Sequence, residues 1–433
     1  MKSGSRASIV AVAWVAALQL LVLPASVRCD SARNVVLFIG DGMGFEQVKA
    51  GRFFKGTNLV FEIWDDAAEM MTHSSNSAVT DSAASGTAMA TGRKVRNGVL
   101  SIAIPGDGGE LETLLEYFKG KGKRTGLVTT TYMTDATPGA FGAHETNRYN
   151  RVSVAADYLA QTRPNVLFGG GGNGMTLERA VAEGYTVVTN ADELAVLDTA
   201  AETMVSGQFG RGHLPYEYDG LGDLPHLSDM TRTALSLLQH STNGFFLMVE
   251  GGRIDHACHD NDIVYCVRET VEFDNAVDAA LSWAAKRDDT LMIVTADHEC
   301  GGLRVLADNE AGIEPDVSWT TTGHTGTNVG VWAWGPRSQQ VSGVLDNTDI
   351  HGIVVRAYLL ASSARSVGEE DGAVSSGWDA RRGDVFRLER APCLTNDSWT
   401  ALVTITAQMD RITLKDTNPP AVGPAFYRLM SVR

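Results

Sequence analysis

The sequence predicts an α/β protein, in which helices cover both faces of a central, mostly parallel β-sheet and a small β-rich segment follows. Three observations support this prediction. Short runs of uninterrupted apolar residues are typical of strands that are buried on both faces of a parallel sheet. Segments of helical periodicity separate these runs, as in repeated βαβ units. Near residue 362 both patterns stop, and a different composition begins.

Six apolar runs are expected to form the strands of the sheet. Each has about five to seven residues, a length that suits a strand better than a helix. The runs lie at residues 34–40, 124–130, 165–169, 245–249, 290–295 and 329–334. Helices are expected where apolar residues recur every three to four positions. These segments are 111–119, 230–239, 264–286 and 349–360.

The last part of the chain has a different character. Residues 363–384 are rich in serine, glycine and charge, which is typical of a linker. Residues 385–433 contain short alternating stretches such as LVTITA and RITL. We therefore expect one large domain at residues 30–362, a linker, and a small β-rich C-terminal segment. This segment weakly resembles terminal β-modules of secreted bacterial proteins, which suggests contact with the cell surface or with glycans. The alternative is an extension that packs on the large domain.

The N-terminal residues 1–29 have the features of a signal peptide. Lys2 and Arg6 form a positive start, and residues 7–23 carry no charge and are largely apolar. This stretch is slightly short for a membrane span, and no later stretch is as long. We expect cleavage near its end and a secreted, periplasmic or cell-surface protein. An uncleaved membrane anchor is the alternative.

The charge of the chain excludes some functions. Asp and Glu number 52 against 36 Lys and Arg, which gives a formal net charge of −16. A protein that binds nucleic acid without sequence preference needs a basic surface, so no such surface is expected. A phosphate substrate is still compatible with this acidity, because bound metal ions can reverse the local charge of a site.

Residues of metal-ligand type follow most of the expected strands. In open α/β sheets, ligands bind outside the carboxyl ends of the strands. A single aspartate there is usually a turn former, but a gathering of carboxylates would repel one another unless divalent cations were bound. The mixture of carboxylate and imidazole favours zinc over calcium. The residues are Asp41, Asp135, Glu250, Asp255, His256, His259, Asp297, His298 and His324.

A candidate nucleophile lies in the run TDSAASGTA at residues 80–88, where a helix is expected to begin. Ser82 would lie at the N-terminus of that helix, where the backbone favours bound anions. Taken alone, the run is better explained as a serine-rich loop that caps a helix.

Together these motifs resemble those of the alkaline phosphatase family. They are GDGMG, TDSAASGTA, TDATPGAFGAHETNR, VEGGRIDHACH, TADHE and GHTG, in family order between residues 34 and 360. The resemblance implies a three-layer αβα fold. It also implies hydrolysis of phosphate monoesters to an alcohol and inorganic phosphate through a phosphoserine, with two zinc ions and one magnesium ion as cofactors.

The resemblance also implies a role for each matching residue. Ser82 matches the nucleophile, and Arg148 matches the arginine that binds two phosphate oxygens. Asp41, Asp297 and His298 match the ligands of the zinc ion that activates Ser82. The second zinc ion, which holds the leaving-group oxygen and then the attacking water, would be bound by three further residues. These are Asp255, His259 and His324.

At the third metal site, the sequence agrees less well with any one group of the family. Asp41, Thr137 and Glu250 match the magnesium ligands, and Asp135 matches a residue that orients water on that ion. His256 would contact the phosphate or water bound to it. Bacterial forms have aspartate at the position of Asp135, whereas vertebrate forms have histidine at the position of His256. This combination leaves zinc or another transition metal as an alternative to magnesium.

Other features stay open or are expected to be structural. Residues 302–323 are too few for the large insertion of vertebrate forms, which contributes to dimers, so a homodimer is possible but not required. Cys258 and Cys266 could form a disulfide or remain as free thiols. The glycine run at residues 169–172 lacks a phosphate-loop lysine and is expected to be a tight turn. The histidines outside the motifs are expected to be surface or core residues. These are His73, His144, His213, His226, His240 and His351.

Two alternatives to a secreted phosphomonoesterase follow from the same residues. One is a phosphodiesterase of the same superfamily, and the other is a non-catalytic surface-binding protein with a degenerate site. The arginine, the serine and the magnesium-type ligands favour small phosphate monoesters as substrates. Inorganic phosphate is then expected to inhibit the reaction as its product.

Overall fold

The computed structural model describes residues 32–359 and six later strands at 366–370, 373–379, 385–391, 400–406, 411–416 and 426–431. The predicted signal peptide at residues 1–29 lies outside these described residues, as does Cys393. None of the described helices is long and apolar enough to cross a lipid bilayer.

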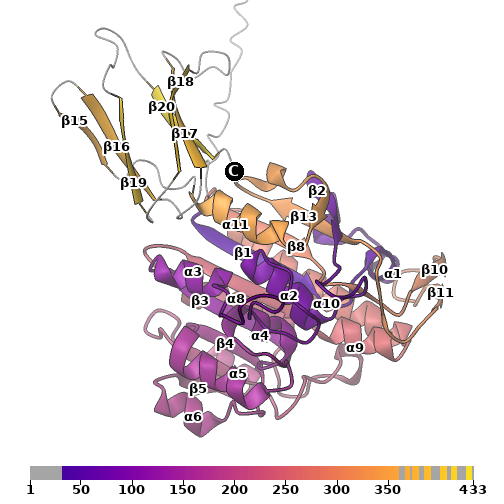
Figure 1. Cartoon of the computed structure of the whole chain (residues 1–433). Helices are drawn as coiled ribbons and strands as arrows, with labels where there is room; N and C mark the ends of the chain where they lie inside the picture. Colours follow the sequence, from indigo (N-terminus) through magenta and orange to yellow (C-terminus); the bar gives the residue numbers. More distant parts are fainter. Residues whose placement is uncertain are drawn as a thin grey trace, which may run out of the picture.

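A mixed sheet of ten strands forms the centre of the molecule (Figure 1). Every pair of neighbouring strands is parallel except the pairs made by β13, which runs antiparallel to β2 and β8. The strand order is β14 (Gly343–Asp346), β2 (Asp66–Met71), β13 (Val329–Trp334), β8 (Thr290–Thr295), β1 (Asn34–Gly40), β7 (Phe245–Gly251), β3 (Arg124–Tyr132), β4 (Val166–Gly170), β6 (Val205–Gln208) and β5 (Thr186–Val188). The predicted mostly parallel α/β sheet is therefore confirmed.

The three central strands explain why the sequence contains uninterrupted apolar runs. Every residue of β1, β7 and β8 is buried. Helices pack on both faces of the sheet, so no position in these strands faces water. All six expected strands are present, and their bounds differ from the predicted ones by no more than two residues.

Two groups of helices make up the outer layers. Contacts join α2 (Ser82–Thr91), α3 (Leu114–Gly120), α4 (Ala136–Gly142) and α11 (Asp349–Leu359) into one group. Contacts join α1 (Phe45–Lys55), α8 (Leu227–Leu238), α9 (Arg253–His259) and α10 (Ile263–Ala284) into the other group. Three further helices are α5 (Arg151–Asp157), α6 (Leu177–Ala182) and α7 (Ala191–Ala195). Of these, α5 and α6 lie beside β4 and β5 (Figure 1).

The predicted helices begin where capping residues allow. The segment expected at 111–119 starts at Leu114, because Thr113 caps the helix and forms a capping box with Glu116. The segment expected at 264–286 starts one residue earlier, because the Asp262 side chain accepts hydrogen bonds from the first turn.

Short strands occupy residues 302–323, the segment that was judged too short for the large insertion of vertebrate forms. β10 (Arg304–Ala307) and β11 (Asp316–Ser318) form an antiparallel pair there. β9 (Glu299–Cys300) pairs with β12 (His324–Thr325), and this pairing brings Cys300 opposite His324. Periodicity does not reveal two-residue strands, so the sequence did not predict them.

Two small antiparallel sheets follow the large domain in the chain. One has the order β15 (Ser366–Glu370), β16 (Ala373–Asp379), β19 (Arg411–Asp416), and the other has the order β18 (Thr400–Thr406), β17 (Val385–Ala391), β20 (Phe426–Ser431). The predicted β-rich C-terminal character is confirmed. Two of the strands, β15 and β16, fall inside the segment expected to be a linker at residues 363–384. The domain boundaries themselves stay a prediction.

Candidate active site

The predicted site residues gather at one edge of the central sheet. Asp41 follows β1, Glu250 lies near the end of β7, and Asp297 comes two residues after β8. His324 precedes β13, but β13 is antiparallel to β8, so its first residues lie beside the last residues of β8. One antiparallel strand therefore places a residue from its beginning at the carboxyl edge of the parallel strands.

The turn after β1 depends on a glycine. Gly42 has a φ of +71°, and a Cβ atom there would lie 2.8 Å from the Asp255 Oδ1 atom. The Gly42 amide donates a hydrogen bond to Asp297 Oδ1 at 3.1 Å. Only glycine allows the backbone to pass this close to two carboxylates with this conformation.

The first cluster contains Asp41, Asp297 and His298, whose ligand atoms lie within 4.8 Å of one another. His298 Nε2 is 3.5 Å from Asp41 Oδ1 and 3.1 Å from Asp297 Oδ2. The Asp297 and His298 side chains are fully buried. These are the three residues expected to hold the zinc ion next to the nucleophile.

Ser82 lies beside this cluster. Its Oγ atom is 3.3 Å from His298 Nε2. Ser82 is the first residue of α2, and the Asp81 side chain caps the helix by accepting a hydrogen bond from the Ala84 amide at 3.0 Å. A buried serine at a helix N-terminus, next to a group of cation ligands, is well placed to meet an anionic substrate.

The second cluster contains Asp255, His259, Cys300 and His324, again within 4.8 Å of one another. Asp255 and His259 lie one turn apart on α9, as their spacing predicted. The shortest distances are 3.2 Å from Asp255 Oδ2 to His259 Nε2 and 3.1 Å between the Nε2 atoms of His259 and His324. The His298 and His324 rings stack with centroids 3.6 Å apart, so the two clusters adjoin.

The hydrogen bonds at Nδ1 of two imidazoles orient their Nε2 atoms towards the centre of the second cluster. His259 Nδ1 lies 2.6 Å from the Thr322 carbonyl, and His324 Nδ1 lies 3.0 Å from the Thr80 carbonyl. A carbonyl can only accept, so each Nδ1 carries a proton, and in the neutral ring each Nε2 presents a lone pair towards Asp255. Metal-ligating histidines are usually fixed in this way.

Several buried carboxylates in the two clusters have unusual pKa values. Burial, followed by the negative charge of Asp297 and Asp255, raises the pKa of Asp41. Burial and Asp255 likewise raise the pKa of Asp297. Asp41 Oδ1, Asp255 Oδ1 and Asp297 Oδ2 are buried and accept no hydrogen bond from the described residues. Unpaired buried carboxylate oxygens next to lone pairs of imidazoles fit divalent cations.

The residues expected at the third metal site are near one another but are less tightly gathered. Thr129 and Thr131 donate hydrogen bonds to Glu250 Oε2. Thr137 is buried on α4, and Asp135 caps the same helix by accepting from the Ala136 amide at 2.8 Å. Asp41, Thr137 and Glu250 thus belong to the same sheet edge, and burial raises the pKa of Glu250 to about 7, an effect that the hydroxyls of Thr129 and Thr137 oppose.

Arg148 lies between two carboxylates. Its guanidinium donates to Asp81 Oδ2 at 3.1 Å and lies 3.6 Å from Asp135 Oδ1. Burial opposes its charge, but the carboxylates of Asp135, Asp81 and Asp41 raise the pKa of Arg148 further. The arginine therefore stays charged, and its contacts with Asp81 and Asp135 fix the orientation of the guanidinium.

His256 and His213 differ from the ligand histidines. The Arg253 guanidinium donates to His256 Nδ1 at 2.7 Å, and the Tyr132 amide donates to His213 Nδ1 at 3.2 Å. Because both donors are obligatory, each Nδ1 accepts and each neutral ring carries its proton on Nε2. Both rings lie with Asp135 in a group within 4.8 Å. They offer N–H donors, which suit an anion or water better than a cation.

Two residues of the site, His213 and Cys300, were not expected there. His213 was predicted to be a surface or core histidine, but it contacts the His256 ring at a centroid distance of 4.5 Å. Cys300 had no predicted role, although it lies two residues after His298 and could have been noted for that reason. Cys258 and Cys266 are free buried thiols with sulfur atoms 3.6 Å apart, which settles the open disulfide question for this structure.

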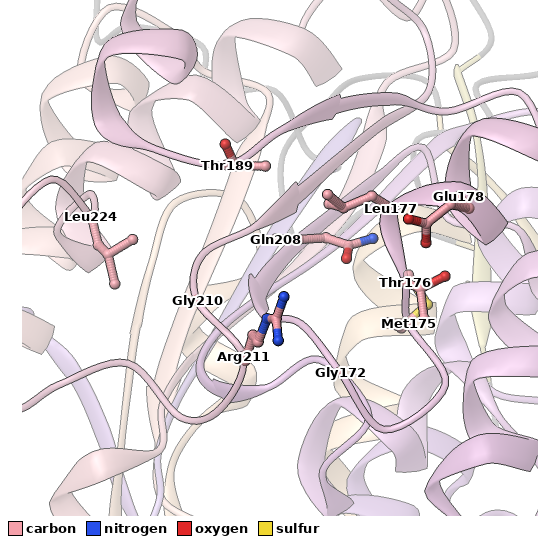
Figure 2. A pocket seen from close by; sticks show the side chains of 10 residues that line it. All are labelled: Gly172, Met175, Thr176, Leu177, Glu178, Thr189, Gln208, Gly210, Arg211 and Leu224. Carbon is pink, nitrogen blue, oxygen red and sulfur yellow. The ribbon is translucent and has the colours of Figure 1, made fainter.

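A separate cavity of about 620 Å³ lies near the ends of β4 and β6 (Figure 2). The glycine run at 169–172 ends β4 and leads into a turn that is closed by a bridge between Gly172 and Met175, as expected. Gln208 and Arg211 line the cavity together with Thr176 and Glu178. None of the predicted site residues lines it.

Known proteins resemble the chain over most of its length. A family model described as alkaline phosphatase matches residues 32–315 and 306–360. The chain is 33% identical to alkaline phosphatase 3 of Bacillus subtilis, over 76% of this chain and 89% of that protein. It is also 33% identical to the streptomycin-6-phosphate phosphatase of Streptomyces griseus, over 75% of this chain and 90% of that protein.

Solved structures give the same result. The alkaline phosphatase of the Antarctic bacterium TAB5 has a TM-score of 0.69 and 29% sequence identity, covering 76% of this chain and 98% of that chain. A mutant of that enzyme was solved with Mg bound in a site named M3. Its TM-score is 0.67 at 28% identity, covering 76% of this chain and 98% of that chain.

Proposed function

The chain belongs to the alkaline phosphatase family, and from this premise we propose that it hydrolyses phosphate monoesters through a phosphoserine at Ser82. The observation that carries the proposal is the position of Ser82. Its hydroxyl lies 3.3 Å from His298 Nε2, in the first cluster of cation ligands and at the N-terminus of α2.

We assign two divalent cations, zinc ions, to the two clusters. Asp41, Asp297 and His298 would hold one ion, with the Ser82 oxygen as a further contact. Asp255, His259 and His324 would hold the other. Two such ions supply positive charge for the entering and leaving oxygens of an in-line displacement and favour the ionised serine.

A magnesium ion is proposed for a third site. Asp41, Thr137 and Glu250 would be its ligands, and Asp135 would orient water next to it. The mutant of the TAB5 enzyme solved with magnesium in its M3 site supports this choice. Hydrogen bonds from the Tyr132 amide and the Arg253 guanidinium already occupy Nδ1 of His213 and His256, which supports oxygen ligands, and hence magnesium, at this site.

The protein groups act on the phosphoryl group in a defined order. Ser82 Oγ releases its proton to water and attacks phosphorus, the bond from phosphorus to the alcohol oxygen breaks on the opposite side, and the alkoxide leaves as the alcohol after taking a proton from water. Arg148 binds two non-bridging oxygens with its charged fork, while His256 donates its Nε2 proton to phosphate or to water on it. Water then displaces Ser82 from phosphorus in a second in-line step. Two inversions give net retention at phosphorus. Inorganic phosphate, the product, competes with the substrate for the site.

The substrate class is small phosphate esters. Recognition is concentrated on the phosphoryl group, so we expect tolerance of different alcohols. The similarity to a streptomycin-6-phosphate phosphatase is consistent with a phosphorylated small molecule as substrate. The signal-peptide features of residues 1–29 lead us to propose that the protein acts outside the cytoplasm.

A chelator-controlled assay tests the proposed function. Full-length mature protein is incubated with 4-nitrophenyl phosphate and with bis-(4-nitrophenyl) phosphate at about pH 8–10, where metal-activated nucleophiles are ionised. We expect faster turnover of the monoester, loss of activity with chelator, and recovery with zinc and magnesium. Faster turnover of the diester would favour the phosphodiesterase alternative. No turnover after reconstitution would favour the non-catalytic alternative.

A further inference from the structure

The second cluster contains one more side chain of metal-ligand type than the resemblance to the family assigns. Its ligand atoms come from Asp255, His259, His324 and also from the Cys300 sulfur, and all four lie within 4.8 Å of one another. Cys300 is buried and is not part of a disulfide. A fourth donor in this place would change the character of the site.

The backbone fixes Cys300 in the cluster. β9 and β12 pair in antiparallel register with Cys300 directly opposite His324. Directly opposite residues project from the same face of the pair, with Cβ atoms about 4.5–5.5 Å apart. The Cys300 amide also donates to the Gly42 carbonyl at 3.2 Å, next to the turn that carries Asp41. The thiol is therefore held beside His324, in the group that also contains Asp255 and His259.

The distances inside the cluster match a small tetrahedral site. Bonds of about 2.0–2.1 Å from zinc to nitrogen or oxygen require ligand atoms about 3.3–3.4 Å apart. The two imidazole Nε2 atoms are 3.1 Å apart, and they lie 3.2 Å (His259) and 3.5 Å (His324) from Asp255 Oδ2 and Oδ1 respectively. Asp255 Oδ1 is buried without a hydrogen-bond partner among the described residues, which is a second sign of a cation at this point.

From this geometry we propose that Cys300 is a fourth protein ligand of the cation held by Asp255, His259 and His324. The inference rests on the proposed metal site and adds a sulfur donor to it. The thiol proton is released to solvent when the cation binds. A thiolate is a soft ligand that selects zinc over magnesium or calcium. The site would then hold zinc tightly and would bind substrate oxygen by expanding to five ligands, as catalytic zinc can.

The other buried thiols serve as matched controls. Cys258 lies on α9, next to His259, but its sulfur atom is 3.7 Å from Gln47 Nε2 and 3.6 Å from the Cys266 sulfur. Among the described residues, neither Cys258 nor Cys266 belongs to a group of cation ligands. Cys258→Ser and Cys266→Ser therefore change a buried thiol close to the site without removing the proposed ligand.

The test replaces zinc by cobalt in the full mature chain. Cobalt thiolate bonds give a charge-transfer band in the near ultraviolet, whereas cobalt bound only to nitrogen and oxygen does not. We expect the band in the unmodified protein and in both control variants, and its loss in Cys300→Ser at unchanged cobalt content. We also expect Cys300→Ser to lose zinc to a competing chelator at least about tenfold more readily, since even loss of an outer partner costs 10–100-fold.

X-ray absorption on the unmodified zinc protein makes the test independent of how the variant folds. A zinc–sulfur distance of about 2.3 Å supports the inference. Full zinc content with only nitrogen and oxygen neighbours, or a cobalt band that persists in Cys300→Ser, would overturn it and leave the proposed function intact. A protein that binds neither metal would overturn both.

Discussion

The atom that meets each imidazole Nδ1 separates two kinds of histidine at the sheet edge. Backbone carbonyls face Nδ1 of His259 and His324, so their Nε2 atoms can bind a cation. N–H donors face Nδ1 of His213 and His256, so their Nε2 atoms carry protons. Residue type alone does not distinguish the two kinds, because the difference is made by the backbone around each ring.

Metal content of two histidine variants tests this distinction. We expect His324→Ala to lose close to one equivalent of zinc, because it removes a lone pair from the second cluster. His213→Ala should keep its full metal content, since the ring offers only a donor. Elemental analysis after gel filtration gives both values. Loss of a full equivalent from His213→Ala would mean that the ring binds a cation after all.

At the level of single residues, the sequence predicted much of the site but not all of it. The structure brings Asp41, Asp297, His298 and Ser82 together, and the motif order indicated them. His213 was assigned to the surface or core, because it lies in none of the motifs. Cys300 lies two residues after His298, which was the one signal for it in the sequence, but the pairing of two-residue strands that sets it opposite His324 has no sequence pattern of its own.

The N-terminus of α2 is held by Asp81 in two ways. Its Oδ1 atom accepts from the Ala84 amide, and its Oδ2 atom accepts from the Gly98 amide and from Arg148. Asp81→Ala removes the cap as well as the partner of Arg148, whereas Asp81→Asn keeps an acceptor for the cap.

We expect Asp81→Ala to lower the free energy of unfolding by about 1–2 kcal/mol, the usual value of an N-cap. Asp81→Asn should lose less stability but should bind inorganic phosphate differently, because Arg148 loses a charged partner. Chemical denaturation and product-inhibition constants measure the two effects separately. Equal stability of the alanine and asparagine variants would contradict the capping role.

A half-buried pair, His144 and Glu116, joins α3 to the segment after α4 and predicts a pH dependence of stability. His144 Nε2 lies 3.1 Å from Glu116 Oε1, and its Nδ1 lies 2.9 Å from the Ser101 carbonyl. Burial opposes the charged ring, but the Glu116 carboxylate and the Ser101 carbonyl raise the pKa of His144 to about 9. The stabilisation is therefore complete below the unfolded pKa of about 6.5 and is lost as the pH rises through 9.

His144→Gln removes this contribution. We expect the variant to be less stable than the unmodified protein by about 1–2 kcal/mol at pH 6, the size of a partly screened hydrogen bond to a charged group. The difference should shrink towards pH 10. Denaturation of both proteins across this range measures it, and a difference that stays constant with pH would show that His144 is neutral in the folded state.

The strands also show how far periodicity can lead. Fully buried runs such as β1, β7 and β8 were predicted almost to the residue, because both faces of the sheet are covered. β2 and β14 were missed, since they are half-exposed and lack a continuous apolar run. β15 and β16 lie in a serine- and glycine-rich segment whose composition favoured a linker.

For the whole molecule, part of the negative charge of the chain is explained by the carboxylates of the candidate site. A formal charge of −16 is unfavourable for binding a phosphate ester. Part of that charge is concentrated in buried carboxylates that lie close together, and burial, followed by their mutual repulsion, raises the pKa values of Asp41 and Asp297. Cations at these positions would stabilise the fold and make the site attractive to an anion.

Removal of the cations should therefore destabilise the whole catalytic domain. We expect chelator treatment to lower the midpoint of thermal unfolding, and zinc with magnesium to restore it in proportion to the logarithm of free metal. Scanning calorimetry at several metal concentrations measures this linkage. An unchanged midpoint after verified metal removal would contradict a structural contribution of the clusters.

Detection of phosphate on Ser82 is the most direct test of the proposed reaction. The metal-loaded protein is mixed with substrate, quenched in acid within one turnover and digested for mass spectrometry. We predict a phosphorylated peptide containing Ser82, absent from Ser82→Ala and from chelated protein but present in the control Ser75→Ala, which changes an exposed serine of the preceding loop. Rapid hydrolysis by Ser82→Ala, or phosphate found on another residue, would contradict Ser82 as the nucleophile.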